Sequence, residues 1–363
     1  METNENKVRE PLFHISKRAY LPWQKAWLIR LAAIFAAFII CGLLSYIVIG
    51  ASPLDFYSAL FKGSLGSERK IWKFLKDGAV LLCISLAVTP AFKMKFWNTG
   101  AEGQALMGAL ATAACMFYLG GKVPDALLIV IMFAAAVIVG SIWGTIPAIF
   151  KAIWGTNETL FTLMMNYVAT CIVSYCLIIW TPNGSSSLGI LPNGHLPTIG
   201  NEYLLIILVS VLLAFMMYVY LSYSKHGYEI SVVGESYKTA CYIGIEVKKV
   251  IIRTMILSGA LCGLAGFLIV SGLDHSVTTE TIGGEGFTAI MVSWLAKFNP
   301  ILMMLTSLFI VFLSQGAAQV SQNFDVSPAF PDMIVGIILF FIIGCEFFIE
   351  YKINFRSSKK GGK

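Results

Sequence analysis

The sequence predicts an all-α protein that crosses a membrane many times. Of its 363 residues, 57% are apolar and only 13% are charged, and the mean hydropathy is +0.78. Soluble chains are about 45–50% apolar and about 25% charged, so much of this surface needs an apolar solvent, which lipid tails supply. Apolar runs of helical length also recur along the chain. We therefore expect an all-α polytopic membrane protein.

Three regions follow one another along the chain. Residues 1–27 are polar and mixed in charge, so we expect a cytoplasmic leader without a cleavable signal. Residues 28–350 form the transmembrane domain, and residues 351–363 form a basic cytoplasmic tail. We expect about ten transmembrane helices, since each crossing takes roughly 20 residues. The apolar segments lie near residues 28–50, 71–92, 101–119, 125–150, 156–180, 203–222, 251–273, 286–297, 301–319 and 330–349.

Two of these segments do not resemble complete spans. The segment 101–119 opens with charged and glycine residues, and the segment 286–297 is too short to cross the hydrocarbon core. We expect broken or short spans here, either half-helices or re-entrant segments. Membranes tolerate such segments only where protein or a watery cavity covers the free backbone groups.

The basic residues support this layout. If the spans alternate from a cytoplasmic N-terminus, 20 of the 26 Lys and Arg residues lie on the inside, and the loops 181–202, 274–285 and 320–332 contain none. The positive-inside rule expects this of exported loops. Both the N- and C-termini are therefore predicted to be cytoplasmic. The net charge of +6 is explained by basic residues at the inner membrane face, without a nucleic-acid partner.

Cysteine and glycine patterns indicate packing. The eight cysteines lie almost wholly within apolar runs and form no CxxC pair, so we expect small core residues and neither disulfides nor metal ligands. Gly140 and Gly144 are four residues apart, as are Gly259 and Gly263, with Gly266 three further on. This spacing predicts helices whose backbones approach closely.

The first polar cluster is residues 97–104, Trp-Asn-Thr-Gly-Ala-Glu-Gly-Gln. Asn98 or Thr99 is suited to cap the helix that follows, and Glu102 favours its N-terminus. Capping does not explain why two glycines, a carboxylate and the amides of Asn98 and Gln104 stand together where lipid exposure is costly. A broken helix beside a substrate path explains them better.

The second cluster begins at Thr156-Asn157-Glu158 and continues to Thr162 and Asn166. Thr156 or Asn157 is a suitable helix cap, with Glu158 in the first turn. Asn166 lies one turn beyond Thr162 and shares its face, so we expect it to point into the bundle. Hydrogen bonding between helices and contact with a substrate both explain such an asparagine.

The third feature is the longest inside loop, residues 223–250. It predicts a short helix near 236–243, capped by Ser236 and ended by Gly244. A cytoplasmic helix of this kind is amphipathic enough to dock a partner.

Together these stretches resemble the permease family of ATP-binding-cassette importers that serve simple sugars and nucleosides. The likeness covers roughly residues 30–350. Asn98-Thr-Gly-Ala-Glu-Gly-Gln104 resembles the N-x-G-A-E-G-Q motif of that family, and its nucleoside branch, which is associated with basic membrane lipoproteins, is the most similar. This chain departs from the residues that are common in the family at Thr99, at Ser236 to Lys238 and at Lys297-Phe298. The other matching stretches are Asn157-Glu158 with Thr162 to Tyr167, Gly234-Glu235 with Ala240 and Gly244, and Gly286-Phe287 to Asn299-Pro300.

The resemblance implies a multi-pass permease subunit in a bacterial plasma (inner) membrane. It implies a second permease subunit, identical or homologous, two cytoplasmic ABC ATPase subunits and an extracytoplasmic substrate-binding lipoprotein. The substrate would be a nucleoside or a related simple sugar, and Phe287 would stack on its base or sugar. The implied substrate-path residues are Asn98, Thr99, Glu102, Gln104, Thr162, Asn166 and Phe287, and the implied ATPase-coupling residues are Gly234, Glu235, Ala240 and Gly244.

The chain itself is not expected to be an enzyme or to bind a cofactor. It has no GxxxxGK[ST] loop, because Gly120-Gly121-Lys122 is followed by Val123, so ATP and Mg would bind the partner ATPase. HExxH and GxSxG motifs are also absent from the sequence.

The alternative function is an ion-coupled secondary transporter of small polar solutes. In that case Glu102, Glu158, Asp274 or Glu285 would titrate. These acids lie near span ends, and no two of them share a mid-span helical face, which disfavours this alternative.

Overall fold

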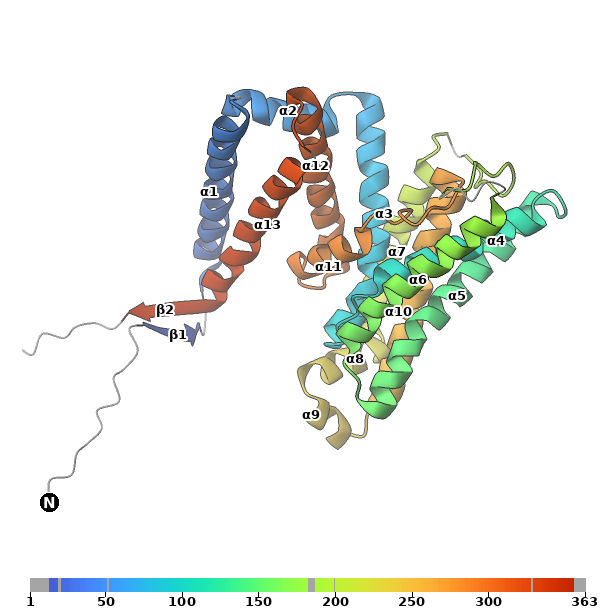
Figure 1. Cartoon of the computed structure of the whole chain (residues 1–363). Coiled ribbons are helices and arrows are strands. Elements are labelled where there is room, and N and C mark those ends of the chain that lie inside the picture. Colours follow the sequence, from blue (N-terminus) through green and yellow to red (C-terminus); the bar gives the residue numbers. More distant parts are fainter. Residues whose placement is uncertain are drawn as a thin grey trace, which may run out of the picture. The chain divides into compact units, whose positions relative to one another are not determined.

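The computed structural model describes residues 13–18, 21–50, 52–181, 187–198, 200–327 and 329–355 (Figure 1). These residues are predominantly helical, as the sequence predicts. The helices are α1 (Trp23–Ile49), α2 (Pro53–Leu65), α3 (Glu68–Lys93), α4 (Ala101–Leu119), α5 (Asp125–Trp154), α6 (Glu158–Trp180), α7 (Leu204–Tyr223), α8 (Lys225–Glu235), α9 (Tyr237–Tyr242), α10 (Val247–Ile269), which a π-helical turn η1 (Val270–Asp274) continues, α11 (Glu285–Leu295), α12 (Pro300–Phe324) and α13 (Ala329–Glu350).

Seven helices in the described part are long and apolar enough to cross a membrane: α1, α5, α6, α7, α10 with η1, α12 and α13. The remaining expected crossings are α3, α4 and α11. Helix α11 has 11 residues and is therefore about 16 Å long, about half of the hydrocarbon core. The prediction of a short segment at 286–297 is confirmed.

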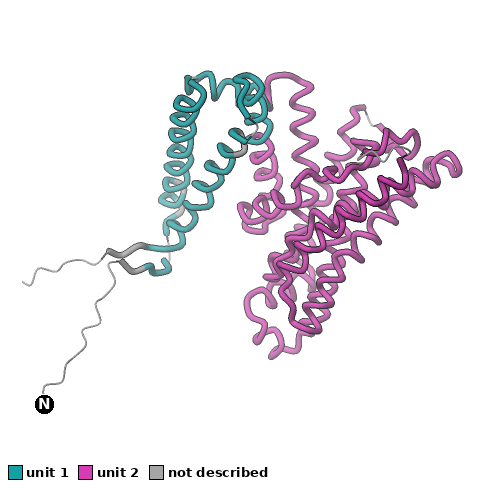
Figure 2. Tube along the Cα trace, viewed as in Figure 1, with its two compact units in different colours: residues 1–63, 313–363 teal, residues 64–312 magenta. Residues whose placement is uncertain are grey.

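Two compact units make up the chain (Figure 2). In the first unit, residues 1–63 and 313–363, helix α1 packs against α13. Strands β1 (Phe13–Lys17) and β2 (Tyr351–Phe355) pair in antiparallel register, and Arg30 Nη2 lies 2.8 Å from Glu346 Oε1. The strands join the segments that we expected to be leader and tail, and α1 begins at Trp23, inside the expected leader. Residues 1–12 and 356–363 lie outside the described residues.

The second unit, residues 64–312, is held together by small residues on α4, α5 and α10. A Cβ on Gly140 would overlap the Gly259 carbonyl, and a Cβ on Gly108 would lie 2.5 Å from the Gly263 Cα. The predicted close approach of helix backbones is confirmed. Lipid gives no hydrophobic drive for helix association, so close van der Waals packing of this kind stabilises the bundle.

Helix α4 is the central helix of this unit. It packs against α5, α6 and α10, and its alanines at 101, 105, 109 and 113 are fully buried. Its N-terminus therefore starts inside protein rather than in lipid, which makes a polar helix start at this depth tolerable.

The loop 223–250 contains two helices, α8 and α9, joined by Ser236. The Ser236 hydroxyl accepts a hydrogen bond from Thr239 N at 3.3 Å, and Gly244 has a φ of +84°, a conformation that favours glycine. The predicted helix near 236–243 and its two ends are confirmed. Helix α8 was not predicted.

Cysteine burial follows the prediction only in part. Cys41, Cys83, Cys262 and Cys345 are buried, whereas Cys171 on α6 and Cys241 on α9 are exposed. For these two the expectation of a core position is wrong. For Cys171 the reason is that an apolar run does not distinguish the lipid-facing side of a span from its packed side, because both are apolar. Cys241 lies on α9, outside the candidate spans.

Candidate functional site

The predicted polar cluster lies where α4, α6, α10 and α11 meet inside the second unit (Figure 1). After α3 ends at Lys93, the chain turns through an extended segment and begins α4 at Ala101. The first turn of α4 has free N–H groups, and the side chain of Asn166 on α6 accepts from one of them, Gly103 N. Four elements thus converge on one helix start.

Asn98 and Gln104 form a buried pair. Gln104 Nε2 donates to Asn98 Oδ1 at 3.0 Å, and Asn98 Nδ2 donates to Gln104 Oε1 at 3.3 Å. Asn98 Nδ2 also donates to Ser258 Oγ on α10 at 3.2 Å. Neither amide is accessible, with exposed fractions of 0% and 1%. These hydrogen bonds hold the segment before α4 to the first turn of α4 and to α10.

Asn166 caps the same helix from α6. Its Oδ1 accepts from Gly103 N at 2.9 Å, and its Nδ2 donates to Thr99 O at 2.9 Å. Thr162, one turn earlier on α6, contacts Thr99 Oγ1 through its own hydroxyl at 3.0 Å. Asn166 therefore makes the hydrogen bonds between helices that one of its two interpretations predicts.

Glu102 joins the start of α4 to the start of α11. Its Oε1 accepts from Gly284 N at 2.9 Å and its Oε2 from Gly286 N at 2.8 Å. A carboxylate at a helix N-terminus is favourable, because it pairs with free N–H groups and with the positive end of the helix dipole. A Cβ on Gly286 would overlap Glu102 N. Glycine at this position permits the contact.

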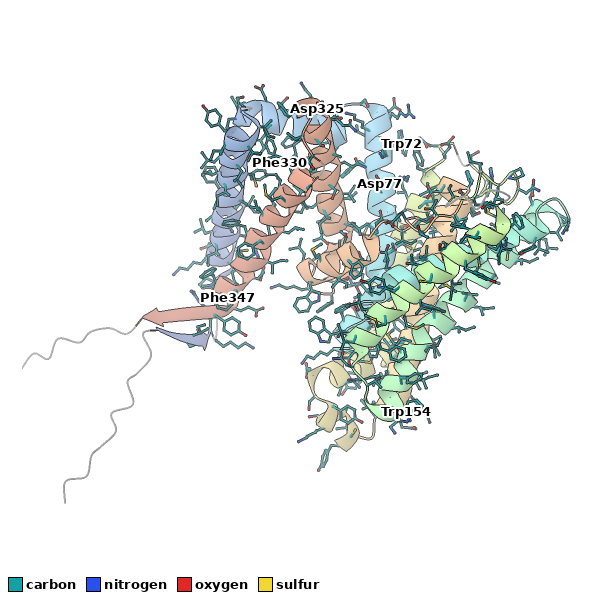
Figure 3. The ribbon with its side chains drawn as sticks, in the orientation of Figure 1. Trp72, Asp77, Trp154, Asp325, Phe330 and Phe347 are labelled. Carbon is teal, nitrogen blue, oxygen red and sulfur yellow. The ribbon has the colours of Figure 1, made fainter. Side chains whose placement is uncertain are left out.

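Glu285, the first residue of α11, is the polar group of this region that the path prediction missed. Its Oε2 is buried and has no hydrogen-bond partner among the described residues. Asp77, Glu102, Asp274 and Lys76 all act on it electrostatically. Asp77 lies on α3 (Figure 3).

The four acids of the ion-coupled alternative do not form one site. Glu102 and Asp274 lie near Glu285, but Glu158 pairs with Lys151 at 2.7 Å and lines a separate pocket with Gly234 and Glu235.

Phe287 is the predicted path residue with the most exposed side chain, at 43%. Trp294, seven residues later on the same face of α11, is 47% exposed, and Trp97 packs beside it with ring centroids 5.5 Å apart. Trp294 was not predicted as a site residue, and Trp97 was noted only as the first residue of the cluster 97–104. The i and i+7 spacing of Phe287 and Trp294 was the available signal for Trp294.

The predicted coupling residues lie at one end of the second unit. Gly234 and Ala240 are buried, whereas Glu235 and Gly244 are exposed. The exposed fraction of Tyr242 on α9 is 93%.

The predicted coupling residue Gly234 lies against the segment that precedes the polar cluster. A Cβ on Gly234 would overlap the Lys93 carbonyl, so α8 lies against the end of α3. Met94, Lys95 and Phe96, which lead to Asn98, line a pocket of about 260 Å³ together with Gly234. Helix α8 therefore lies beside the segment that leads into α4.

Known proteins resemble this chain over most of its length. A family model described as "Branched-chain amino acid transport system / permease component" matches residues 70–343. A guanosine ABC transporter permease protein of Bacillus subtilis is 29% identical over 88% of this chain and 93% of its own. A nucleoside ABC transporter permease protein of Lactococcus lactis is 27% identical, covering 93% and 98%. A glucose ABC transporter permease protein of Haloferax volcanii is 26% identical, covering 96% and 95%.

Proposed function

Because this chain belongs to the family of permease components of branched-chain amino acid transport systems, we propose that it forms the membrane path of an ATP-binding-cassette importer for a nucleoside or a related simple sugar. Relatives named for guanosine, nucleoside and glucose transport support this substrate class. The observation that carries the proposal is the contact of Gly234 with the Lys93 carbonyl, because it connects a docking surface to the polar cluster.

The proposed assembly supplies everything that this chain lacks. Two ABC ATPase subunits bind ATP and Mg and dock on α8 and α9, where Tyr237 and Tyr242 are exposed. A second permease subunit completes the path, and an extracytoplasmic substrate-binding lipoprotein delivers the substrate. The chain would cross a bacterial inner membrane about ten times with both termini in the cytoplasm. It would meet lipid along its spans and would not contact nucleic acid.

The proposed mechanism divides the site residues into two roles. Asn98, Gln104 and Asn166 are buried and position α4, whereas Phe287 is exposed and can stack on a substrate ring. Glu102 holds the short helix α11 to the start of α4, so these two elements move together. Closure of the ATPases would push α9, and α8 would pass the displacement to residues 93–98.

Uptake of radiolabelled nucleoside by the assembled importer tests the two regions separately. We expect Glu102→Ala to impair uptake while ATPase subunits still co-purify. We expect Gly244→Trp to impair uptake by distorting the end of α9, because φ of +84° is unfavourable for tryptophan. Full transport by both variants would refute the residue assignments.

The energy source is tested in the same assay. We expect uptake to require the co-purifying ATPase and, with ATP supplied, to be insensitive to a proton uncoupler. Uptake that stops with the uncoupler while ATP is present would favour the ion-coupled alternative.

A further inference from the structure

A polar pocket lies between α8, the turn that follows α9 and the first turns of α10. It has a volume of about 370 Å³ and is separate from the polar cluster at α4. Its lining includes Lys225 and Glu229 of α8, the turn around Ile245, and Lys249 and Arg253 of α10. Among the lining residues, the proposed function gives a role to Gly244 and none to the charged side chains.

The pocket has more positive than negative charge. Lys225, Lys249 and Arg253 face two carboxylates, Glu229 and Glu246, which leaves one positive charge. Arg253 Nη2 lies 2.8 Å from Glu229 Oε2, and this contact lowers the pKa of the Glu229 carboxyl. Arg253 Nε is buried without an acceptor among the described residues, and the side chain of Lys225 is 85% exposed. Lys249 Nζ pairs with Glu246 at 2.8 Å, and Lys225 Nζ lies at the longer distance of 4.0 Å from Glu229 Oε1. The exposed Lys225 is therefore the basic group most available to an anion.

A shallow apolar groove of about 560 Å³ lies along one face of α7, which is followed directly by α8 of the polar pocket. Phe215, Met216, Val219 and Tyr223 line it, and each is more than half exposed. Helix α7 is one of the candidate membrane spans, so in a bilayer this groove faces acyl chains.

Tyr220 connects the pocket and the groove. It lines the groove, interacts with Arg253 of the pocket, and has its ring centroid 6.3 Å from that of His226. Lys225 follows Ser224, the last groove residue, directly in the chain. A molecule with an anionic head and an apolar chain would match this arrangement.

We propose that this junction binds one anionic phospholipid, with the headgroup phosphate in the polar pocket and an acyl chain along the groove of α7. Lysine and arginine at the end of a span attract anionic lipid, and their long side chains reach the headgroups while their stems stay apolar. The residues that end α9 also line the pocket, namely Ile243, Gly244 and Ile245. A bound lipid would therefore stabilise the conformation at the end of α9. The proposal requires only that α7 spans a membrane, and importer activity is not its readout.

Native mass spectrometry of the purified full-length chain in detergent can measure this binding. The probes are phosphatidylglycerol, phosphatidylcholine with the same acyl chains, and free glycerol 3-phosphate. We expect preferential binding of phosphatidylglycerol, about fivefold weaker in Lys225→Ala, because one basic residue near the surface contributes roughly that factor. Lys225 is exposed, so its loss leaves the Glu229–Arg253 pair intact.

Two matched variants sharpen the result. Lys238→Ala removes an equal charge from α9, outside the pocket, and should bind phosphatidylglycerol like the unaltered chain. Val219→Trp should obstruct the groove and weaken phosphatidylglycerol binding while Lys225 is retained.

Three results would overturn the proposal. They are equal affinity for the two lipids, equal loss in Lys225→Ala and Lys238→Ala, and competition by glycerol 3-phosphate as strong as by the lipid. The last would indicate a site for a free phosphate.

Discussion

At the residue scale, polar side chains inside the bundle form hydrogen bonds with backbone groups at helix starts. Glu102 is the clearest case, because its two oxygens each accept a backbone N–H of the α11 start. Glu102→Gln keeps one acceptor but places an amide N–H against the second N–H. An unsatisfied buried group costs about 1–3 kcal/mol, so we expect a lower melting temperature in detergent. Glu280→Gln, at an exposed position, is the control, and equal melting temperatures would contradict the assigned contact.

Substitution of Asn166 is also expected to lower the stability of the folded chain. Asn166→Ala leaves Gly103 N and Thr99 O without the partners they have at 2.9 Å, and we expect a loss of about 1–3 kcal/mol in unfolding free energy for each. Thermal unfolding measures this. Thr170→Ala removes a hydroxyl that bonds within α6, to Asn166 O, and should cost clearly less. If the two variants unfold alike, Asn166 does not join α6 to α4.

At the element scale, the α5–α10 contact depends on the absence of side chains. A Cβ on Gly263 would overlap the Ala136 carbonyl, so Gly263→Ala should lower the unfolding free energy by about 1–3 kcal/mol through overpacking. Gly336 of α13 has nothing within 4 Å of the corresponding position. Gly336→Ala should therefore be neutral or slightly stabilising. Thermal unfolding of both variants in one detergent is the measurement, and a stable Gly263→Ala would show that the helices separate easily.

The two loops at the other end of α10 predict a pH dependence. Leu191 N donates to His275 O at 2.8 Å, and the rings of His195 and His275 stack with centroids 3.7 Å apart. Burial and the neighbouring His195 lower the pKa of His275, against the opposing effects of Glu202 and the Val270 backbone. The folded loops therefore favour the neutral ring. This stabilisation is complete above the ordinary histidine pKa of about 6.5 and is lost as pH falls through the lower pKa of the folded state.

Hydrogen exchange of residues 187–198 measures this effect. We expect amide protection to decrease as the pH falls below about 6.5, after correction for the intrinsic pH dependence of exchange. His275→Asn provides the reference, since it removes the titrating ring, and should show little change in corrected protection. An equal decrease in the variant would exclude His275 as the cause.

At the scale of the whole molecule, the proposed orientation makes a labelling prediction. In a chain that retains only Cys241, which is exposed on α9, a membrane-impermeant maleimide should react in inside-out vesicles and not in intact cells. A cysteine-free chain with Gly189→Cys should behave in the opposite way, because Gly189 lies in a loop that is predicted to be exported and has open space around it. The same sidedness for both cysteines would overturn the predicted layout.

The accuracy of the sequence-based predictions differs between local and long-range features. The helix in the loop 223–250 was predicted with both its ends, because Ser236 and Gly244 act on their own chain neighbours. The short span at 286–297 was visible from length alone. The partners of Glu102 could not be predicted, since Gly284 and Gly286 lie more than 180 residues away and backbone donors have no sequence signal. The pairing of β1 with β2 was missed for the same reason.

The sequence by itself determined that this chain is an α-helical membrane protein with polar helix starts. The excess of apolar residues acts through the solvent, whereas glycine spacing and capping residues act on the helix that contains them. Only the tertiary structure decided what those polar residues bind. It showed that Asn98, Gln104 and Asn166 are buried and hydrogen-bonded to hydroxyl, backbone and amide partners. Phe287, which was predicted with them as a path residue, is exposed. The physical reason is that a buried polar group must find a partner, and that partner is chosen by the packing of distant helices.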